Sequence, residues 1–285
     1  MSKVTTTESV SSAIDFTTLT CIAGVINYKG ARIQLLDTPG IIQGAASGKG
    51  RGRQVIAVAR TADVILMMLE PGKGEVQKRL LTKELEAMGV RLNRKRPNIS
   101  FVEKKTGGIS FNTMVPLTKI NEKTVRLVLH EYRIHNAQVL FREDATVDDF
   151  IDAIEGNRSY LRCLYVYNKV DRTTMQHLDK IARQPDTVVV SCEMSLNIDY
   201  LIEKIWEYLA LARVYTKKRG ARPDFSDPMI MRSGSTVEDI CRAIHKDMVE
   251  KFKYALVWGT SAKHMPQRVG LNHEVQDEDV VEVHT

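Results

Sequence analysis

Short apolar runs alternate with amphipathic stretches over most of the chain. A short run rich in β-branched or aromatic residues predicts a buried strand, whereas apolar residues three or four positions apart predict a helix. On this basis, the first part of the chain holds a hairpin within 24–37 that turns at Lys29-Gly30, a helix at 53–60, a strand at 64–69 and a helix at 75–88. Alternating strands and helices are typical of an α/β fold with a parallel sheet.

The pattern changes between Arg91 and Arg142. A basic run at 91–96 is read as a solvated loop in preference to a nucleic-acid site. After it we expect strands at 98–102 and 109–111, a helix around 125–129 and a strand at 137–141. This order predicts a small α+β insertion at 91–142.

The α/β alternation then resumes and ends near residue 212. We expect helices at 147–154, 175–183 and 198–211, with strands at 163–167 and 188–190 between them. The apolar residues of 198–211 follow helical spacing, which indicates core packing. Residues 217–223 look like a linker, and the rest predicts a strand at 229–231, a helix at 237–249 and strands at 255–259 and 280–283. We therefore predict one domain at 1–212, interrupted by the insertion, and a ubiquitin-like interaction domain at 213–285.

Composition excludes several classes of protein. Apolar residues make up 43% and charged residues 27% of the 285 positions, as in ordinary soluble globular proteins. No apolar run approaches the roughly 20 residues of a membrane span, and Met1 to Thr7 lack the apolar core of a secretory signal. The four cysteines are far apart, so free thiols in a reducing compartment are expected. A net charge of +6 permits an RNA or ribosome partner without requiring one.

The segment Asn168-Lys169-Val170-Asp171 directly follows the strand at 163–167. At a strand end, this pattern suits a guanine reader. The carboxylate of Asp171 can accept two parallel hydrogen bonds from guanine N1–H and N2–H, for which adenine has no matching donors. Asn168 is placed to join neighbouring loops, and the Lys169 stem can lie over the base. The alternative is a plain surface turn, since all three residue types suit turns.

A second box, Asp37-Thr38-Pro39-Gly40, ends the second strand of the hairpin. The aspartate can hold magnesium through water, and the glycine lets its N–H approach a γ-phosphate. The alternative is a simple Pro-Gly turn. A weaker signal is Ser191-Cys192-Glu193 at the next strand end, whose backbone N–H groups can cap guanine O6.

The glycine-rich basic loop from Gly44 to Arg53 is not a Walker A loop. Gln43 stands where that motif needs its first glycine, and Gly50 stands where it needs a hydroxyl. Because the segment follows Gly40, it is read as a mobile switch loop.

Together these boxes resemble the developmentally regulated GTP-binding protein (DRG) family of the Obg superfamily. The resemblance is carried by Phe16-Thr17-Thr18-Leu19, the boxes at 37–40 and 168–171, the loop at 48–54, and the TGS-like segments 253–259 and 266–270. It implies a doubly wound G domain with a ribosomal-protein-like α+β insertion, followed by a β-grasp TGS domain. It also implies a cytoplasmic, ribosome-associated GTPase switch that converts GTP to GDP and uses Mg²⁺. The partners implied are ribosome or RNA and a DRG family regulatory protein, with no membrane.

The same resemblance assigns the site residues. Thr18 and Asp37 would serve the metal. The GTP-binding set would be Thr17, Thr18, Asp37, Thr38, Pro39, Gly40, Asn168, Lys169, Asp171, Ser191, Cys192 and Glu193.

Two features depart from related GTPases. Ile41 stands where a water-orienting glutamine is usual, so no catalytic residue is assigned and hydrolysis would need an ion, such as a monovalent cation, or a partner. The Walker A loop and its strand would precede Met1, so the G domain would be incomplete and nucleotide binding weakened. The missing strand would belong between the strands ending at Asp37 and Leu69.

Two functional hypotheses follow, namely a GTPase switch and a non-catalytic ribosome, RNA or protein interaction module that acts through the TGS domain. An RNA-binding protein of unrelated ancestry is a distant third.

Overall fold

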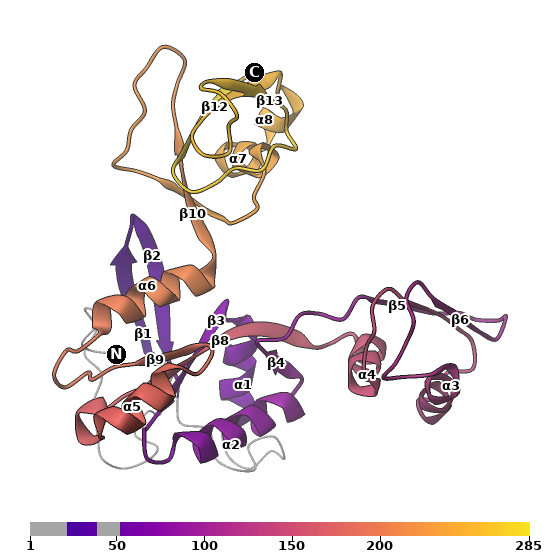
Figure 1. Cartoon of the computed structure of the whole chain (residues 1–285). Coiled ribbons are helices and arrows are strands. Elements are labelled where there is room, and N and C mark those ends of the chain that lie inside the picture. The colour runs from indigo at the N-terminus through magenta and orange to yellow at the C-terminus, as the bar shows by residue number, and fades with distance from the viewer. Residues whose placement is uncertain (1–21, 39–51) are drawn as a thin grey trace. The chain divides into compact units, whose positions relative to one another are not determined.

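The computed structural model describes residues 22–38 and 52–285 (Figure 1). The described residues form two compact units. One comprises 22–38, 66–74 and 164–285, and the other comprises 52–65 and 75–163.

The predicted hairpin is confirmed. It pairs β1 (Ile22–Tyr28) with β2 (Ala31–Asp37) in antiparallel register, with Tyr28 opposite Ala31. Lys29 and Gly30 have φ of 49° and 78°. Positive φ at both central residues is the type I′ turn, whose twist matches that of the strands.

A second sheet carries the α/β part of the chain. Its order is β3-β8-β4, with β9 also paired to β8, and its strands are β3 (Val64–Leu69), β4 (Val90–Leu92), β8 (Ser159–Tyr167) and β9 (Thr187–Val189). Strands β4 and β9 run parallel to β8. The last five residues of β8 are buried, as expected of a strand covered on both faces. In the described part of the chain, β2 and β3 belong to different sheets.

The helices of the α/β part are α1 (Gly52–Thr61), α2 (Gly74–Ala87), α5 (Met175–Ala182) and α6 (Ile198–Leu209), with a short 3-10 turn η1 (Val170–Arg172). Helix α6 buries Leu201, Ile205 and Trp206, as its spacing predicts. It ends two residues earlier than expected because Ala210 takes a left-handed conformation and Leu211 begins a strand. On α2, Leu85 is buried, but Leu80 is exposed, so its predicted apolar face is only partly correct.

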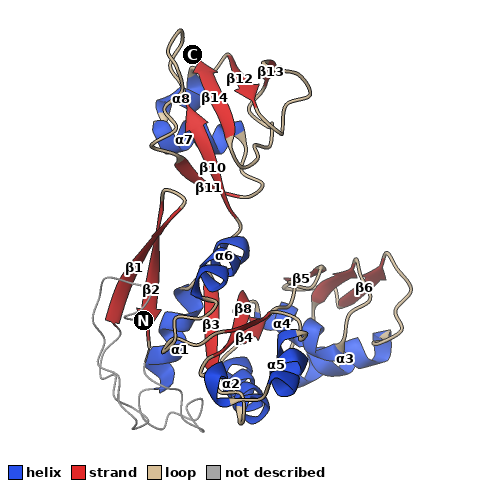
Figure 2. Ribbon diagram, turned by 60° about the vertical axis from the view of Figure 1, so that its left-hand side comes forward, coloured by secondary structure: helices blue, strands red, loops and turns tan. Residues whose placement is uncertain are grey.

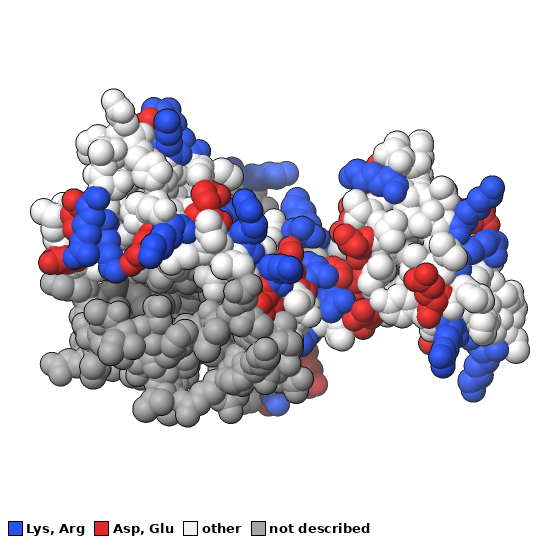
Figure 3. Space-filling view, turned by 90° about the horizontal axis from the view of Figure 1, so that it is seen from below, with Lys and Arg blue, Asp and Glu red and all other residues white. Residues whose placement is uncertain are grey.

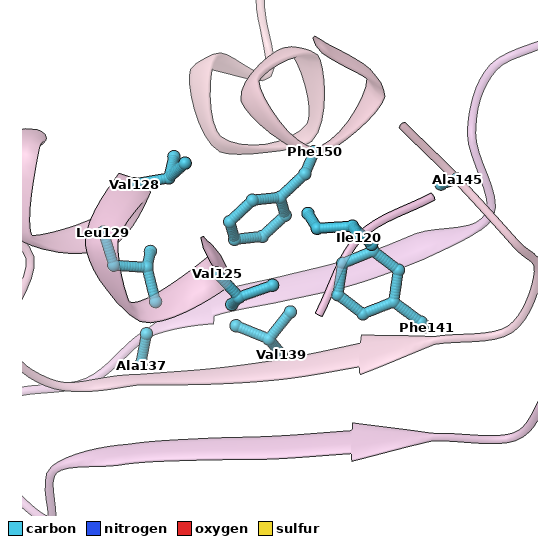
Figure 4. Packing of buried hydrophobic residues seen from close by; sticks show 9 residues of the cluster. All are labelled: Ile120, Val125, Val128, Leu129, Ala137, Val139, Phe141, Ala145 and Phe150. Atoms are coloured by element: carbon cyan, nitrogen blue, oxygen red, sulfur yellow. The ribbon is translucent and has the colours of Figure 1, made fainter. Parts of the chain in front are cut away.

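The predicted strand–strand–helix–strand insertion is present. Its sheet has the order β5-β7-β6, from β5 (Ile99–Glu103), β6 (Ile109–Thr113) and β7 (Ala137–Phe141). Helices α3 (Glu122–Glu131) and α4 (Val147–Glu155) begin at the side-chain caps Asn121 and Thr146. Figure 4 shows their shared core, which contains Ile120, Val125, Val128, Leu129, Ala137, Val139, Phe141, Ala145 and Phe150. The core thus extends past Arg142, where the sequence analysis ended the insertion.

The C-terminal sheet has the order β11-β10-β14-β12-β13. Its strands are β10 (Leu211–Thr216), β11 (Met229–Arg232), β12 (Tyr254–Trp258), β13 (Gln267–Val269) and β14 (Asp279–His284). Residues Val237, Ile240 and Cys241 of helix α7 (Val237–Ile244) pack into the core of this sheet, which gives the predicted β-grasp arrangement. The helix expected to run to Val249 instead stops where His245 becomes extended, and α8 (Asp247–Glu250) follows. Strands β10 and β13 were not predicted.

Cys163, Cys192 and Cys241 are free thiols, as expected for the three cysteines described. Among the described helices, none has both the length and the apolar character needed to cross a bilayer.

Candidate functional site

The segment 168–171 lies where three strands of the second sheet end. Strand β8 ends at Tyr167, and the backbone N–H of Asn168 donates to the carbonyl of Leu69, the last residue of β3, at 2.9 Å. On the other side, the N–H of Val190, just beyond β9, donates to the carbonyl of Tyr167 at 2.8 Å. Figure 2 shows strands β3, β4 and β8 of this sheet. Ligands bind at the carboxyl-terminal edges of strands in open α/β sheets.

Asn168 joins two loops. Its side-chain oxygen Oδ1 accepts hydrogen bonds from the N–H of Lys169 at 2.8 Å and from the N–H of Cys192 at 3.0 Å. The second bond crosses from the loop after β8 to the loop after β9. This is the loop-joining role expected of Asn168.

Asp171 is held from the same neighbouring loop. The hydroxyl of Ser191 donates to Oδ1 of Asp171 at 2.6 Å, and Ser191 is completely buried. This hydrogen bond lowers the pKa of the Asp171 carboxyl, with a smaller contribution from the charge of Arg172. The carboxylate is therefore oriented and ionised, which is the state that accepts hydrogen bonds.

The loop after β9 is closed on itself. The backbones of Ser191 and Leu196 exchange two hydrogen bonds, at 3.2 and 2.9 Å, and the N–H of Met194 donates to the Ser191 hydroxyl oxygen at 3.3 Å. Of the backbone N–H groups expected to face guanine O6, that of Cys192 is already engaged by Asn168. No described residue engages the N–H of Glu193.

Charged side chains form a rim around this site. The ammonium of Lys169 pairs with Glu70, the residue after β3, and lowers the pKa of that carboxyl. The guanidinium of Arg172 lies 3.8 Å from Oδ2 of Asp171 and 3.7 Å from the carboxylate of Glu193. Lys169 adopts a left-handed backbone with φ of 64°, which turns the chain into η1.

Comparison with known proteins shows the family to which this chain belongs. The chain is 62% identical to developmentally-regulated GTP-binding protein 2 of Bos taurus and of Homo sapiens, over 99% of this chain and 78% of each relative. It is 61% identical, with the same coverage, to the homologue from Dictyostelium discoideum. The chain belongs to the developmentally regulated GTP-binding protein family.

Three family models divide the chain. A model described as a 50S ribosome-binding GTPase matches residues 1–105, the C-terminal region of that domain matches 106–211, and the TGS domain matches 212–285. Among solved structures, a GTP-binding protein from Pyrococcus horikoshii aligns with 94% of this chain and 89% of its own. That alignment has 14% identity and a TM-score of 0.44, so it adds nothing to the family assignment.

In this DRG-family chain, the predicted site residues fall into two groups. The structure brings Asn168, Asp171, Ser191 and Cys192 together through hydrogen bonds, with Lys169 and Glu193 on the rim. Asp37 and Thr38 lie at the end of β2 with half-buried side chains. Thr17, Thr18, Pro39, Gly40 and Ile41 lie outside the described residues.

Sequence reasoning missed two residues of this DRG-family site. Glu70 pairs with Lys169, and Arg172 lies between Asp171 and Glu193. Glu70 directly follows strand β3, and Arg172 directly follows the segment 168–171. A polar residue next to a strand end was therefore the available signal.

Proposed function

We propose that this DRG-family chain is a guanine-nucleotide switch that reads the base of GTP and GDP through Asn168 and Asp171. The observation that carries the proposal is a pair of hydrogen bonds, from the Ser191 hydroxyl to Asp171 and from the Cys192 N–H to Asn168, which hold both side chains in place. A preorganised acceptor loses little free energy on binding.

Guanine selection follows from the protonation state and orientation of Asp171. The carboxylate is ionised at neutral pH, and its lowered pKa extends that state into more acidic solution, so it accepts from guanine N1–H and N2–H. Adenine has no such pair of donors and would leave the carboxylate unpaired. A site built to hydrogen-bond one group rejects an analogue that lacks it by roughly 10⁴-fold.

The phosphate end is proposed to use Asp37 with Thr17, Thr18, Thr38, Pro39 and Gly40. A single half-buried carboxylate at a strand end fits Mg²⁺, which usually takes one or two carboxylates and completes its shell with water and phosphate oxygens. Asp37 and Thr18 would hold the ion. When bound, Mg²⁺ neutralises charge that develops on the β- and γ-phosphates.

We further propose that the protein acts in the cytoplasm on ribosomes, where a DRG family regulatory protein stabilises it. The description of the matching G-domain model as ribosome-binding supports this context. The TGS domain, which carries no recognised catalytic residues, would serve as an interaction module.

The decisive test is a change of base preference. Asp171→Asn replaces the acceptor pair with an amide, which suits the C2 carbonyl of xanthine better than the guanine N2–H donor. We expect guanine-nucleotide binding to weaken by at least roughly 100-fold and xanthine-nucleotide binding to strengthen. Competition against a fluorescent GDP derivative on the purified 285-residue chain measures both.

Asp179→Asn is the matched control, because Asp179 is exposed and pairs only with Arg183 on helix α5 among the contacts described. It should leave base preference unchanged. If Asp171→Asn leaves the ratio of GTP affinity to xanthosine triphosphate affinity unchanged, the base-reading role is contradicted. If the wild-type chain binds no guanine nucleotide in the presence of Mg²⁺, the non-catalytic interaction module becomes the better account.

A further inference from the structure

The positive charge of the chain is concentrated in residues 91–142 of the insertion. Residues 91–142 contain eleven Lys or Arg residues and three Asp or Glu residues, a net charge of +8, whereas the whole chain carries +6. The rest of the folded insertion, from Glu143 to Glu155, contains six Asp or Glu residues and no Lys or Arg, so 91–155 as a whole carries a net charge of +2. Ten of the eleven cations are exposed, Arg91 being the exception. The cations of 91–142 are thus separated along the chain from the acidic segment 143–155 of the same body, and a basic patch on one part of a domain is the electrostatic footprint of nucleic-acid binding.

One face of the insertion sheet is not covered by helices. Helices α3 and α4 and the core residues of β7 pack on the same side of the sheet (Figure 4). Strand side chains alternate between faces, so the opposite side, here called the open face, presents Ser100, Val102, Ser110, Asn112, Gln138 and Leu140. These residues are uncharged, and none is aromatic.

Cations stand at both ends of the open face. Lys104 follows β5 and lies two positions beyond Val102, and Arg142 follows β7 and lies two positions beyond Leu140, so both continue the open-face alternation. Because β5 and β7 are antiparallel, with Ile99 opposite Phe141, these cations lie at opposite ends, roughly 20 Å apart along the strands. Glu103, one position from Lys104, points to the other face by the same alternation.

Hydrogen bonds fix the backbone that carries both cations. The N–H of Lys104 donates to the carbonyl of Asn136 at 2.9 Å, and the Asn136 side chain accepts from Gly108 at 2.8 Å and donates to the Lys105 carbonyl at 3.3 Å. At the other end, Arg142 donates to the backbone and side-chain oxygens of Asn98, at 3.1 and 3.4 Å.

The helix-covered side carries a different charge pattern. In the lobe on the right of Figure 3, acidic and basic side chains are interspersed. On α3, Arg126 pairs with Glu122, and Glu131 lies near the end of the same helix. Interspersed charges of both signs attract a polyanion less than an uncharged face with cations at its two ends.

We propose that the open face binds the backbone of double-helical RNA. Lys104 and Arg142 would contact phosphates, while Ser100, Asn112 and Gln138 can hydrogen-bond the 2′-hydroxyls displayed in the wide, shallow minor groove. Single strands are bound chiefly by stacking on aromatic side chains, which this face lacks. The inference names the surface through which the proposed ribosome association would occur, and it rests on that proposed association.

The test compares two charge reversals of equal size in the full chain. Lys104→Glu with Arg142→Glu alters the open face. Lys123→Glu with Arg133→Glu alters α3 and the turn that ends it, and both of its residues are exposed and form no ion pair with other described residues. Fluorescence anisotropy follows binding of an RNA duplex of about 16 base pairs and of an oligouridine of equal length, between about 0.05 and 0.2 M salt.

We expect wild type to prefer the duplex. The open-face variant should lose on the order of 50-fold in duplex affinity at about 0.1 M salt, with a salt slope shallower by about 2, and the α3 variant should behave like wild type. The proposal is overturned by equal affinity for duplex and oligouridine, by an unaltered open-face variant, or by an equal loss in the α3 variant. Fluorescent GDP binding and ribosome co-sedimentation are measured on the same preparations. If both persist while duplex binding fails, the open-face proposal is wrong and the proposed function stands.

Discussion

At the scale of single residues, the chemistry of the site depends on a buried hydroxyl. Ser191 is inaccessible to solvent, and its 2.6 Å bond orients the Asp171 carboxylate and lowers its pKa. A group with a lowered pKa is ionised above that pKa and loses its charge as the pH falls through it. Base recognition by Asp171 should therefore persist into mildly acidic solution.

Replacing Ser191 with alanine tests this link. Without the hydroxyl, the pKa of Asp171 should rise toward its ordinary value, so the loss of GDP binding on acidification should move to higher pH. A pH titration of fluorescent GDP binding measures the midpoint. An unchanged midpoint would show that the Ser191 hydrogen bond does not lower the pKa of Asp171. Asp171→Asn is the control, because it removes the carboxyl whose titration is measured.

The residues of the base site differ in how predictable they were. Asn168, Asp171 and Ser191 follow apolar strands, so their position at one sheet edge could be inferred from pattern alone. Glu70 could not be assigned a role, because its pairing with Lys169 depends on side-chain conformations across two loops. The hydrogen bond from the Cys192 N–H to Asn168 could not be predicted from the sequence either, because it depends on how far two neighbouring strands extend at the sheet edge.

At the scale of elements, a buried ionic cluster fastens α4 to the strands beside it. Asp152 on α4 accepts two bonds from Arg91 on β4, both at 2.7 Å, and one from Arg158 at 2.9 Å. The Asp152 side chain is 4% exposed. Removing one partner of a buried pair leaves the other charge uncompensated, which costs more than the pair contributes as a whole.

Asp152→Asn should therefore lower the free energy of unfolding by about 3 kcal/mol. This value is at the low end of the range for breaking a buried ion pair, because both arginines retain some exposure. Asp148→Asn, an exposed position on the same helix, should cost well under about 1 kcal/mol. Urea denaturation followed by circular dichroism compares them. Equal effects of the two substitutions would show that the cluster contributes little to stability.

Pattern found most of the long elements, but it missed β10 and two of the three-residue strands. Strands β5 and β7 and helices α3 and α6 carry full periods of apolar spacing, so their type and position were predictable. Strands β4 and β13 have three residues each, too few to show a period. Helix α7 was extended too far because Ile240, Ile244 and Met248 continue the apolar spacing past the point where His245 leaves the helix.

At the scale of the whole molecule, the separate groups of site residues imply a division of labour between base recognition and phosphate chemistry. The residues proposed to read the base come from 168–193, whereas the residues proposed for phosphate and metal come from 17–40. Base preference can therefore be intact in a chain that turns over slowly.

We expect slow GTP hydrolysis by the isolated chain, because the isoleucine at position 41 cannot hydrogen-bond an attacking water. Release of inorganic phosphate, measured with and without potassium and with and without a DRG family regulatory protein, is the assay. Stimulation by either addition agrees with an external catalytic group. Rapid hydrolysis in the absence of both would contradict the expectation.

The parallel pairing of β4 with β8 has a consequence for the evolution and engineering of the insertion. The chain leaves the end of β4 and must return to the beginning of β8, because Val90 lies opposite Ser159 and Leu92 opposite Leu161. A tight turn cannot make that return, since parallel neighbours require a crossover of about a dozen residues or more. The small α+β body serves as this crossover, so a shortened version would need a bridging helix or loop in its place.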